Sequence, residues 1–177
     1  MFQEDIAKFT AEHLRTHVKT YLDDWSERFD GSERLTLPVP KVVWNTLVGG
    51  AMQTDPKDTP LITVDCLNKQ NIQSRDNLYY CEYQGAFAGL VTGASSHDVD
   101  RICKRYAAVT EKFIKEHMFI GNGVAFDGFS LMELYYVNTG MSGAMELKLE
   151  EEQPLWAAGF TTRVGWVASE DQPRQHP

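Results

Sequence analysis

The order of segments over residues 61–118 constrains this chain more than any other feature. A short apolar run at residues 61–64 leads into a long polar connection, and an aromatic-rich alternating segment follows over residues 78–92. Residues 96–118 then carry the pattern of a capped amphipathic helix. This order of strand, polar loop, strand and helix is a scaffold. Its connecting segments contain no motif typical of a catalytic site. We therefore expect a protein that works by packing against other proteins.

The helix over residues 96–118 combines a start signal with one continuous apolar stripe. Ser95 lies three residues before Asp98, the spacing of a capping box. A helix of this length extends about 33 Å, enough to cover one face of a small sheet. The stripe consists of residues three and four apart: Val99, Ile102, Cys103, Tyr106, Val109, Phe113, Ile114 and His117.

Other segments complete the predicted layout. Apolar residues at three- and four-residue steps predict an N-terminal helix over residues 4–29. Residues 31–60 contain four prolines and form an extended arm, in which residues 41–48 suit either a strand or a short helix. The polar residues 68–77 are expected to form an exposed loop. Strands are expected at residues 61–67, 78–92, 129–138, 144–150 and 155–168.

This order predicts an α+β fold. An antiparallel or mixed sheet of about five strands carries a long helix packed on one face, together with the N-terminal helix. Alternation places Phe160, Thr162, Val164 and Trp166 on one face of the last strand, and Met145, Leu147 and Leu149 inward in the strand before it. A chain of 177 residues suits a single domain, which we place at residues 1–169, with a flexible tail over residues 170–177.

Charge and cysteine content narrow the class of protein. The net charge of −8 argues against a general DNA-binding protein, which needs a basic face to bind phosphates. Cys66, Cys81 and Cys103 are an odd number without a CxxC motif, as expected of reduced thiols in a cytoplasmic protein. No run approaches the roughly 18 apolar residues of a membrane span, and the acidic N-terminus is unlike a signal peptide.

Two motifs contain residues capable of chemistry. His13 and His17 stand four apart on the N-terminal helix and can present two ligands to one metal ion. Leu14 replaces the glutamate of the zinc-protease pattern, however, and no third ligand is evident. The run Ser95-Ser96-His97-Asp98 fits helix capping better than a catalytic triad, whose members are assembled in space from separate segments.

The remaining motifs point to structure. Gly121-Asn122-Gly123 lacks the lysine of a phosphate-binding loop and follows a helix, so it is expected to end that helix. Cys66 has no partner motif of a catalytic thiol, and the glutamates at residues 150–152 suit a solvated hairpin end. We therefore predict no catalytic, cofactor-binding or metal-binding residue, no cofactor and no enzymatic activity.

Aromatic residues are expected on both faces of the sheet. Tyr79, Tyr80 and Tyr83 lie within five residues, and Tyr135 and Tyr136 are adjacent. Since helices cover one face, the aromatic residues of the other face must also be covered. A neighbouring subunit could cover them, and so, equally, could a second layer built from the N-terminal helix and the arm.

The layout resembles that of the tail terminator proteins of long-tailed bacteriophages, also called tail-completion or neck proteins. The resemblance lies in arrangement and covers roughly residues 61–168, although the arm is longer than in the shorter members of the family. It rests on residues 60–64 (PLITV), the strand over residues 79–91, the helix with Arg105-Tyr106-Ala107 at its middle, and residues 158–164 (AGFTTRV).

The resemblance implies a small structural subunit of the virion tail or neck that closes into a ring, usually a hexamer. Such a ring, assembled in the host cytoplasm, caps the finished tube of the major tail tube protein, ends its elongation and joins it to the head–tail connector protein. DNA passes through the lumen without specific binding, which the acidic balance of this chain suits. A closed ring requires a repeated heterologous interface. No catalytic residue is carried over.

The contacts of such a ring are expected in the polar loops at residues 68–77 and 139–154 and in the arm. A different class stays open, in which the chain is a small-ligand-binding or enzyme domain of unknown substrate with a pocket between sheet and helix. A third interpretation is another neck or tail-tube subunit, although two long helices argue against a tube subunit.

Overall fold

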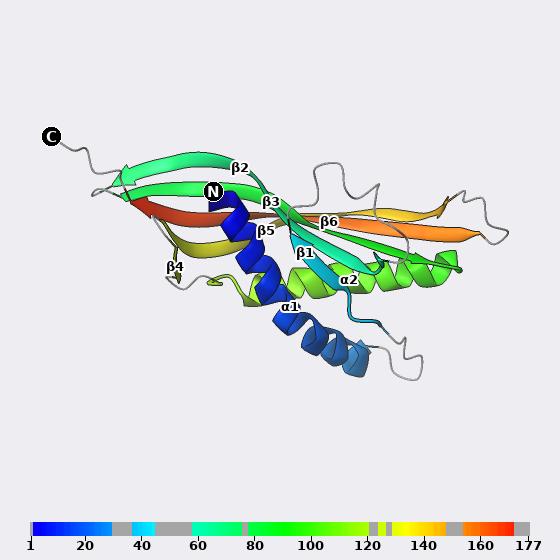
Figure 1. The fold of residues 1–177 in the computed structure, drawn as a ribbon. Coiled ribbons are helices and arrows are strands. Elements are labelled where there is room, and N and C mark those ends of the chain that lie inside the picture. Colours follow the sequence, from blue (N-terminus) through cyan, green and yellow to red (C-terminus); the bar gives the residue numbers. More distant parts are fainter. Residues whose placement is uncertain are drawn as a thin grey trace.

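The chain folds into one mixed sheet with two helices beside it (Figure 1). The computed structural model describes residues 2–29, 37–44, 58–75, 78–120, 124–126, 129–147 and 154–171. In chain order the elements are α1 (Phe2–Phe29), β1 (Lys41–Trp44), β2 (Leu61–Arg75), β3 (Leu78–Gly93), α2 (Ser96–Glu116), β4 (Val124–Phe126), β5 (Phe129–Leu147) and β6 (Leu155–Asp171).

The strands of the described residues lie in the order β1-β2-β3-β6-β5-β4. β1 runs parallel to β2, and the other neighbouring pairs are antiparallel. The predicted α+β class with a mixed sheet is therefore confirmed. The short strands β1 and β4 bring the sheet to six strands, where about five were expected. β1 also decides between strand and helix for residues 41–44 in favour of the strand.

Both helices pack on the same face of the sheet (Figure 1). α2 contacts β3, β5 and β6, while α1 contacts α2, β1 and β2. Phe160, Thr162, Val164 and Trp166 of β6 are buried beneath these helices, as their alternation predicts. The N-terminal helix therefore forms no second layer on the opposite face, and most of the arm lies outside the described residues.

Trp166 organises the centre of the helix-covered face. Its side chain is fully buried, and its indole N–H donates a hydrogen bond of 3.1 Å to Oγ1 of Thr10 in α1. Gly85 of β3 makes room for the ring, since a Cβ there would lie 2.8 Å from the Trp166 ring and 1.9 Å from the backbone oxygen of Asp65. A buried indole whose N–H is paired in this way holds α1 in position on the sheet.

α2 begins as predicted and ends slightly earlier. Oγ of Ser95 accepts a hydrogen bond of 3.3 Å from the backbone N–H of Asp98, which confirms the predicted cap. The helix ends at Glu116, with the backbone N–H of His117 still bonded inside the last turn. The helix therefore stops before residues 121–123, the predicted stop signal, which lie outside the described residues.

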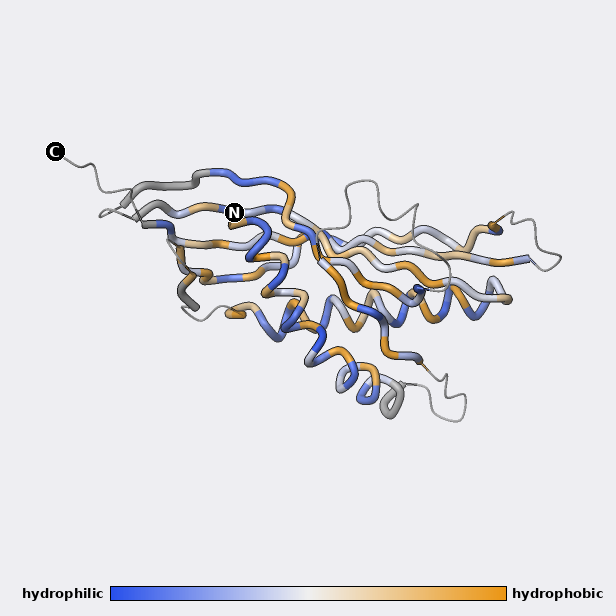
Figure 2. Tube along the Cα trace, viewed as in Figure 1, coloured by the Kyte–Doolittle hydropathy of each residue, from blue (hydrophilic) through white to orange (hydrophobic). Residues whose placement is uncertain are grey.

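The predicted loop over residues 68–77 is wrong as far as Arg75. β2 continues as a strand to this residue and pairs with β3 through two β-bulges. Residues 67–70 are all exposed, and Figure 2 shows hydrophilic residues in β2 between its apolar part and the grey end of the strand. A strand with no buried side has no apolar alternation, so this part of β2 has no periodic signal in the sequence.

β5 and the C-terminal end also differ from the prediction. The two strands expected over residues 129–138 and 144–150 form one strand as far as Leu147, with three register shifts against β6. Met145 was expected to point inward but is 60% exposed. The shift between Ser142 and Met145 moves the latter to the other face of the sheet, which is the effect of a bulge. β6 extends to Asp171, two residues into the expected tail.

Cys66, Cys81 and Cys103 are not joined by disulfides, and the first and last of them are expected to lower the stability at alkaline pH. Burial, and then the neighbouring carboxylates of Asp65 and Asp100, raises the pKa of Cys66 and of Cys103 to about 12. An unfolded thiol releases its proton near pH 8.5, so above this pH the unfolded chain binds fewer protons than the folded one. The free energy of unfolding should therefore fall between pH 8 and pH 10, by at most about 1.4 kcal/mol per pH unit for each thiol.

Urea unfolding at several pH values checks this expectation. The variant Cys66→Ala should show a shallower decrease than the unmodified chain over the same range, because it removes one of the titrating groups. An equally steep decrease in both proteins would show that the thiols do not cause it. The raised pKa also means that nothing around Cys66 favours a reactive thiolate near neutral pH.

Candidate assembly surfaces and a histidine cluster

One long edge of the sheet is formed by β5. The short strand β4 pairs only with residues 129–131. Beyond them the backbone N–H of Leu134 donates to the Met118 carbonyl oxygen at 2.7 Å, and no described strand lies on the outer side of β5. Large apolar side chains are exposed along this stretch, which is unusual for a surface in contact with water alone. They are Met132 (41% exposed), Val137 (50%), Met141 (43%) and Met145 (60%).

The opposite edge is formed by β2. β1 pairs with it only from Leu61 to Val64, and within the described part of the chain no strand flanks the rest of β2, as far as Arg75. Leu67 is 48% exposed at the start of this stretch. Unpaired edge strands present rows of backbone N–H and C=O groups that can pair with another chain. Within the described residues the sheet thus has two different edges with stretches that no strand flanks, one on each side.

The face of the sheet opposite the helices carries a shallow hollow of about 380 Å³. Gln84, Thr161 and Arg163 are exposed there, while the hydroxyl of Tyr135 donates a hydrogen bond to the carboxylate of Glu82. The expectation of aromatic residues on both faces holds for Tyr83, buried beneath the helices, and for Tyr135 on the opposite side. The hollow is lined by Leu67, Asn68, Gln84, Gly85, Ala86, Thr161 and Arg163.

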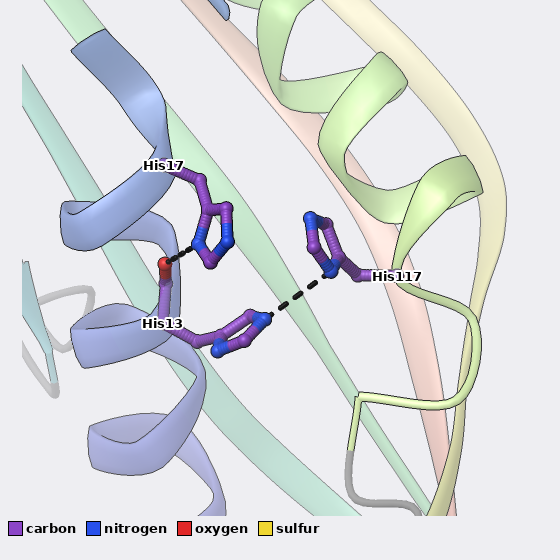
Figure 3. A group of neighbouring side chains, drawn as sticks. All are labelled: His13, His17 and His117. Carbon is purple, nitrogen blue, oxygen red and sulfur yellow. Dashed lines mark hydrogen bonds between the residues drawn. The ribbon is translucent and has the colours of Figure 1, made fainter. Parts of the chain in front are cut away.

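A cluster of three histidines lies between the two helices. His13 and His17 come from α1, and His117 follows the last turn of α2, so that the three rings converge (Figure 3). Nε2 of His13 lies 3.2 Å from Nδ1 of His117, and one ring nitrogen of each residue lies within 4.8 Å of the others. All three side chains are half-buried, and each ring contacts the ring of Phe113.

Hydrogen bonds determine which nitrogen of His17 carries a proton. The hydroxyl of Thr16 donates to the backbone oxygen of His13 at 2.8 Å, so its oxygen acts as an acceptor. Nδ1 of His17 lies 2.8 Å from that hydroxyl oxygen and 2.9 Å from the His13 carbonyl. Both neighbours accept, so Nδ1 carries the proton and Nε2 of His17 has a free lone pair.

The same reasoning applies to His117. The hydroxyl of Tyr21 donates to Oε2 of Glu116 at 2.6 Å, and burial together with this carboxylate raises the pKa of Tyr21, so the donor keeps its proton. Nε2 of His117 lies 3.1 Å from the Tyr21 oxygen and donates to it. Nδ1 of His117 is therefore an acceptor, and it faces His13.

The environment favours the neutral form of His13 and of His117. Burial, and then the proximity of His117 and His17, lowers the pKa of His13. Burial and His17 lower the pKa of His117 as well, against an opposing effect of Glu116. Nε2 of His13 thus donates to Nδ1 of His117, and the cluster is a group of nitrogen ligands that contains no ion pair.

The fold brings together only some of the residues that the sequence singled out. His13 and His17 meet a third histidine that lies 104 positions away from His13, a juxtaposition with no signal in local spacing. His97 stays at the exposed start of α2, 3.7 Å from Asp98, away from the cluster. The glycines at residues 121–123 and the glutamates at residues 150–152 lie outside the described residues.

No protein-family model matches the sequence, and no curated protein matches it either. Among the described residues, no helix has the length and apolar character needed to cross a membrane.

Proposed function

We propose that this chain is a structural subunit of a bacteriophage virion, a tail terminator that forms a ring at the end of the tail tube. The observation that carries the proposal is the pair of unlike edges on opposite sides of the sheet, since among the described residues no strand flanks β5 after residue 131 or β2 after residue 64. When the β5 edge of one copy pairs with the β2 edge of the next, the contact is heterologous. Repetition of such a contact closes into a ring if the rotation allows it.

The exposed apolar side chains of β5 support this assignment of the interface. Backbone pairing alone aligns two edges, whereas burial of methionine and valine side chains supplies free energy and excludes water. At roughly 25 cal/mol per Å² of apolar area, even a modest strip stabilises each contact by several kcal/mol before the entropic cost of association. The occupant of this edge is therefore a second copy of the chain.

Two hairpins that close at opposite ends of the sheet provide different surfaces for the two neighbours of a ring. The β2–β3 turn lies at the end of the sheet where Leu78 pairs with Asp171, and the β5–β6 turn lies at the other end, where Gly93 pairs with Trp156. In a ring closed through its edges, one set of turns meets the last ring of the tail tube. The other set meets the head–tail connector protein.

The mechanism is steric. The face that matches the tube binds its final ring, and the opposite face has no tube-like surface, so no further tube subunit adds. The net charge of −8 disfavours adhesion of DNA to the lumen during passage, because phosphates and carboxylates repel each other. No residue of this chain is required to react.

Light scattering together with negative-stain electron microscopy of the purified protein tests the proposal. The expected result is a closed ring with a central hole, whose mass gives the number of subunits. Co-expression with the major tail tube protein of the same genome should then yield tubes that carry one ring at an end. A protein that stays monomeric both alone and with tube protein would overturn the proposal.

A further inference from the structure

We propose that His13, His17 and His117 bind a divalent transition-metal ion of the zinc class, which joins α1 to α2. The inference does not depend on the ring function, since it rests on a separate group of side chains. Three histidine ligands leave a fourth position of a tetrahedral ion for water or another ligand.

The spacing of the ring nitrogens fits such an ion. Zinc–nitrogen bonds of about 2.0–2.1 Å in a tetrahedron place neighbouring ligand nitrogens about 3.3 Å apart. Nε2 of His13 and Nδ1 of His117 are already 3.2 Å apart, and no pair of ligand atoms exceeds 4.8 Å. Because the side chains are only half-buried, small rotations of the rings bring the third nitrogen to the same spacing.

The hydrogen bonds around the cluster orient the ligands from outside. Thr16 and the His13 carbonyl hold the Nδ1 proton of His17, which directs Nε2 into the cluster (Figure 3). Tyr21, itself bonded to Glu116, holds the Nε2 proton of His117 and leaves Nδ1 for the metal. Outer partners that fix a histidine tautomer in this way are typical of metal sites. A bound ion would replace the proton now shared between His13 and His117.

The donor set selects the class of ion. Imidazole nitrogen suits Zn²⁺, Ni²⁺ and Cu²⁺, whereas Mg²⁺ and Ca²⁺ require mainly oxygen ligands. The carboxylate of Glu116 bonds to Tyr21 and stays in the outer shell. The site is thus expected to bind Zn²⁺ and not Mg²⁺. This difference distinguishes it from unspecific binding of cations by an acidic protein.

The test uses the full chain without a histidine tag, stripped of metal with EDTA and then dialysed free of chelator. Isothermal titration with Zn²⁺ should give one ion per chain, and Mg²⁺ should give no heat above dilution. At a free Zn²⁺ concentration near 100 times the dissociation constant, the melting temperature should rise by roughly 5–10 °C. Replacement by Co²⁺ should produce the visible absorption of a tetrahedral nitrogen-ligated ion.

Single variants locate the ligands. His13→Gln, His17→Gln and His117→Gln should each weaken Zn²⁺ binding at least tenfold and abolish the rise in melting temperature. His97→Gln removes one exposed histidine outside the cluster and should bind as the unmodified chain does. Circular dichroism of the apo variants distinguishes a lost ligand from a lost fold, and a variant that fails to fold is replaced by the asparagine substitution at the same position. Equal losses in His97→Gln and the cluster variants, or no specific Zn²⁺ binding at all, would overturn the proposal.

Discussion

Replacing Trp166 by alanine should lower the free energy of unfolding by about 3–5 kcal/mol, the range for deletion of a fully buried aromatic side chain. The side chain is completely buried, and its N–H donates a buried hydrogen bond that joins β6 to Thr10 of α1. Its loss leaves a cavity in the middle of the sheet and removes the partner of the Thr10 hydroxyl. Since small domains are stable by only about 5–15 kcal/mol, the variant should be close to unfolding.

Urea unfolding monitored by circular dichroism measures this effect, at a protein concentration low enough to keep the chain monomeric. Trp156→Ala on the same strand is the matched control. Its side chain is half-buried at the edge of the core, so it should cost only about 1–2 kcal/mol. Similar losses in the two variants would show that Trp166 is not the centre of the core.

The elements that the sequence predicted well are those with one buried and one exposed side. The stripe of α2 and the alternation of β6 both arise from burial on a single face, and that face is the one the helices share with the sheet. The capping by Ser95 was equally predictable, because a cap depends only on residues in the same turn. For these segments, the side that the local sequence pattern marks as apolar is the side that the tertiary contacts bury.

The elements that the sequence missed lack such a face. The far half of β2 is exposed at residues 67–70, so pairing with β3 holds it in place without any periodic signal. In β5, bulges shift the face on which residues lie, and a strict period of two then assigns Met145 to the wrong side. Bulges depend on the pairing with the partner strand, so the sequence of one strand alone does not predict them.

The histidine cluster was half predictable. The spacing of His13 and His17 indicated two ligands on one helical face, but the third comes from the end of α2. Its place in the cluster depends on how the two helices cross. The same holds for the unlike edges of the sheet, which become visible only when the strand order is known. The contact segments expected at residues 139–154 lie, as far as Leu147, on the β5 edge and not in a loop.

The double variant Met141→Lys with Met145→Lys should abolish ring formation while leaving the subunit folded. Both side chains are largely exposed on the β5 edge, so lysine is tolerated in the free subunit. In the proposed ring the same positions lie against the β2 edge of the neighbour. Burial of two ammonium groups there costs far more than the loss of two methionine contacts, and lysine on an edge strand is a common means of preventing edge pairing.

Sedimentation velocity over a range of concentrations measures the outcome. The double variant should weaken association by at least tenfold, equivalent to about 1.4 kcal/mol per contact. Gln84→Lys with Thr161→Lys is the matched control, because it makes the same change of charge at two exposed residues of the central strands β3 and β6, away from both edges. It should assemble as the unmodified chain does. If the edge variant forms rings and the control does not, the interface lies on the face of the sheet opposite the helices, and the pairing of β5 with β2 is wrong.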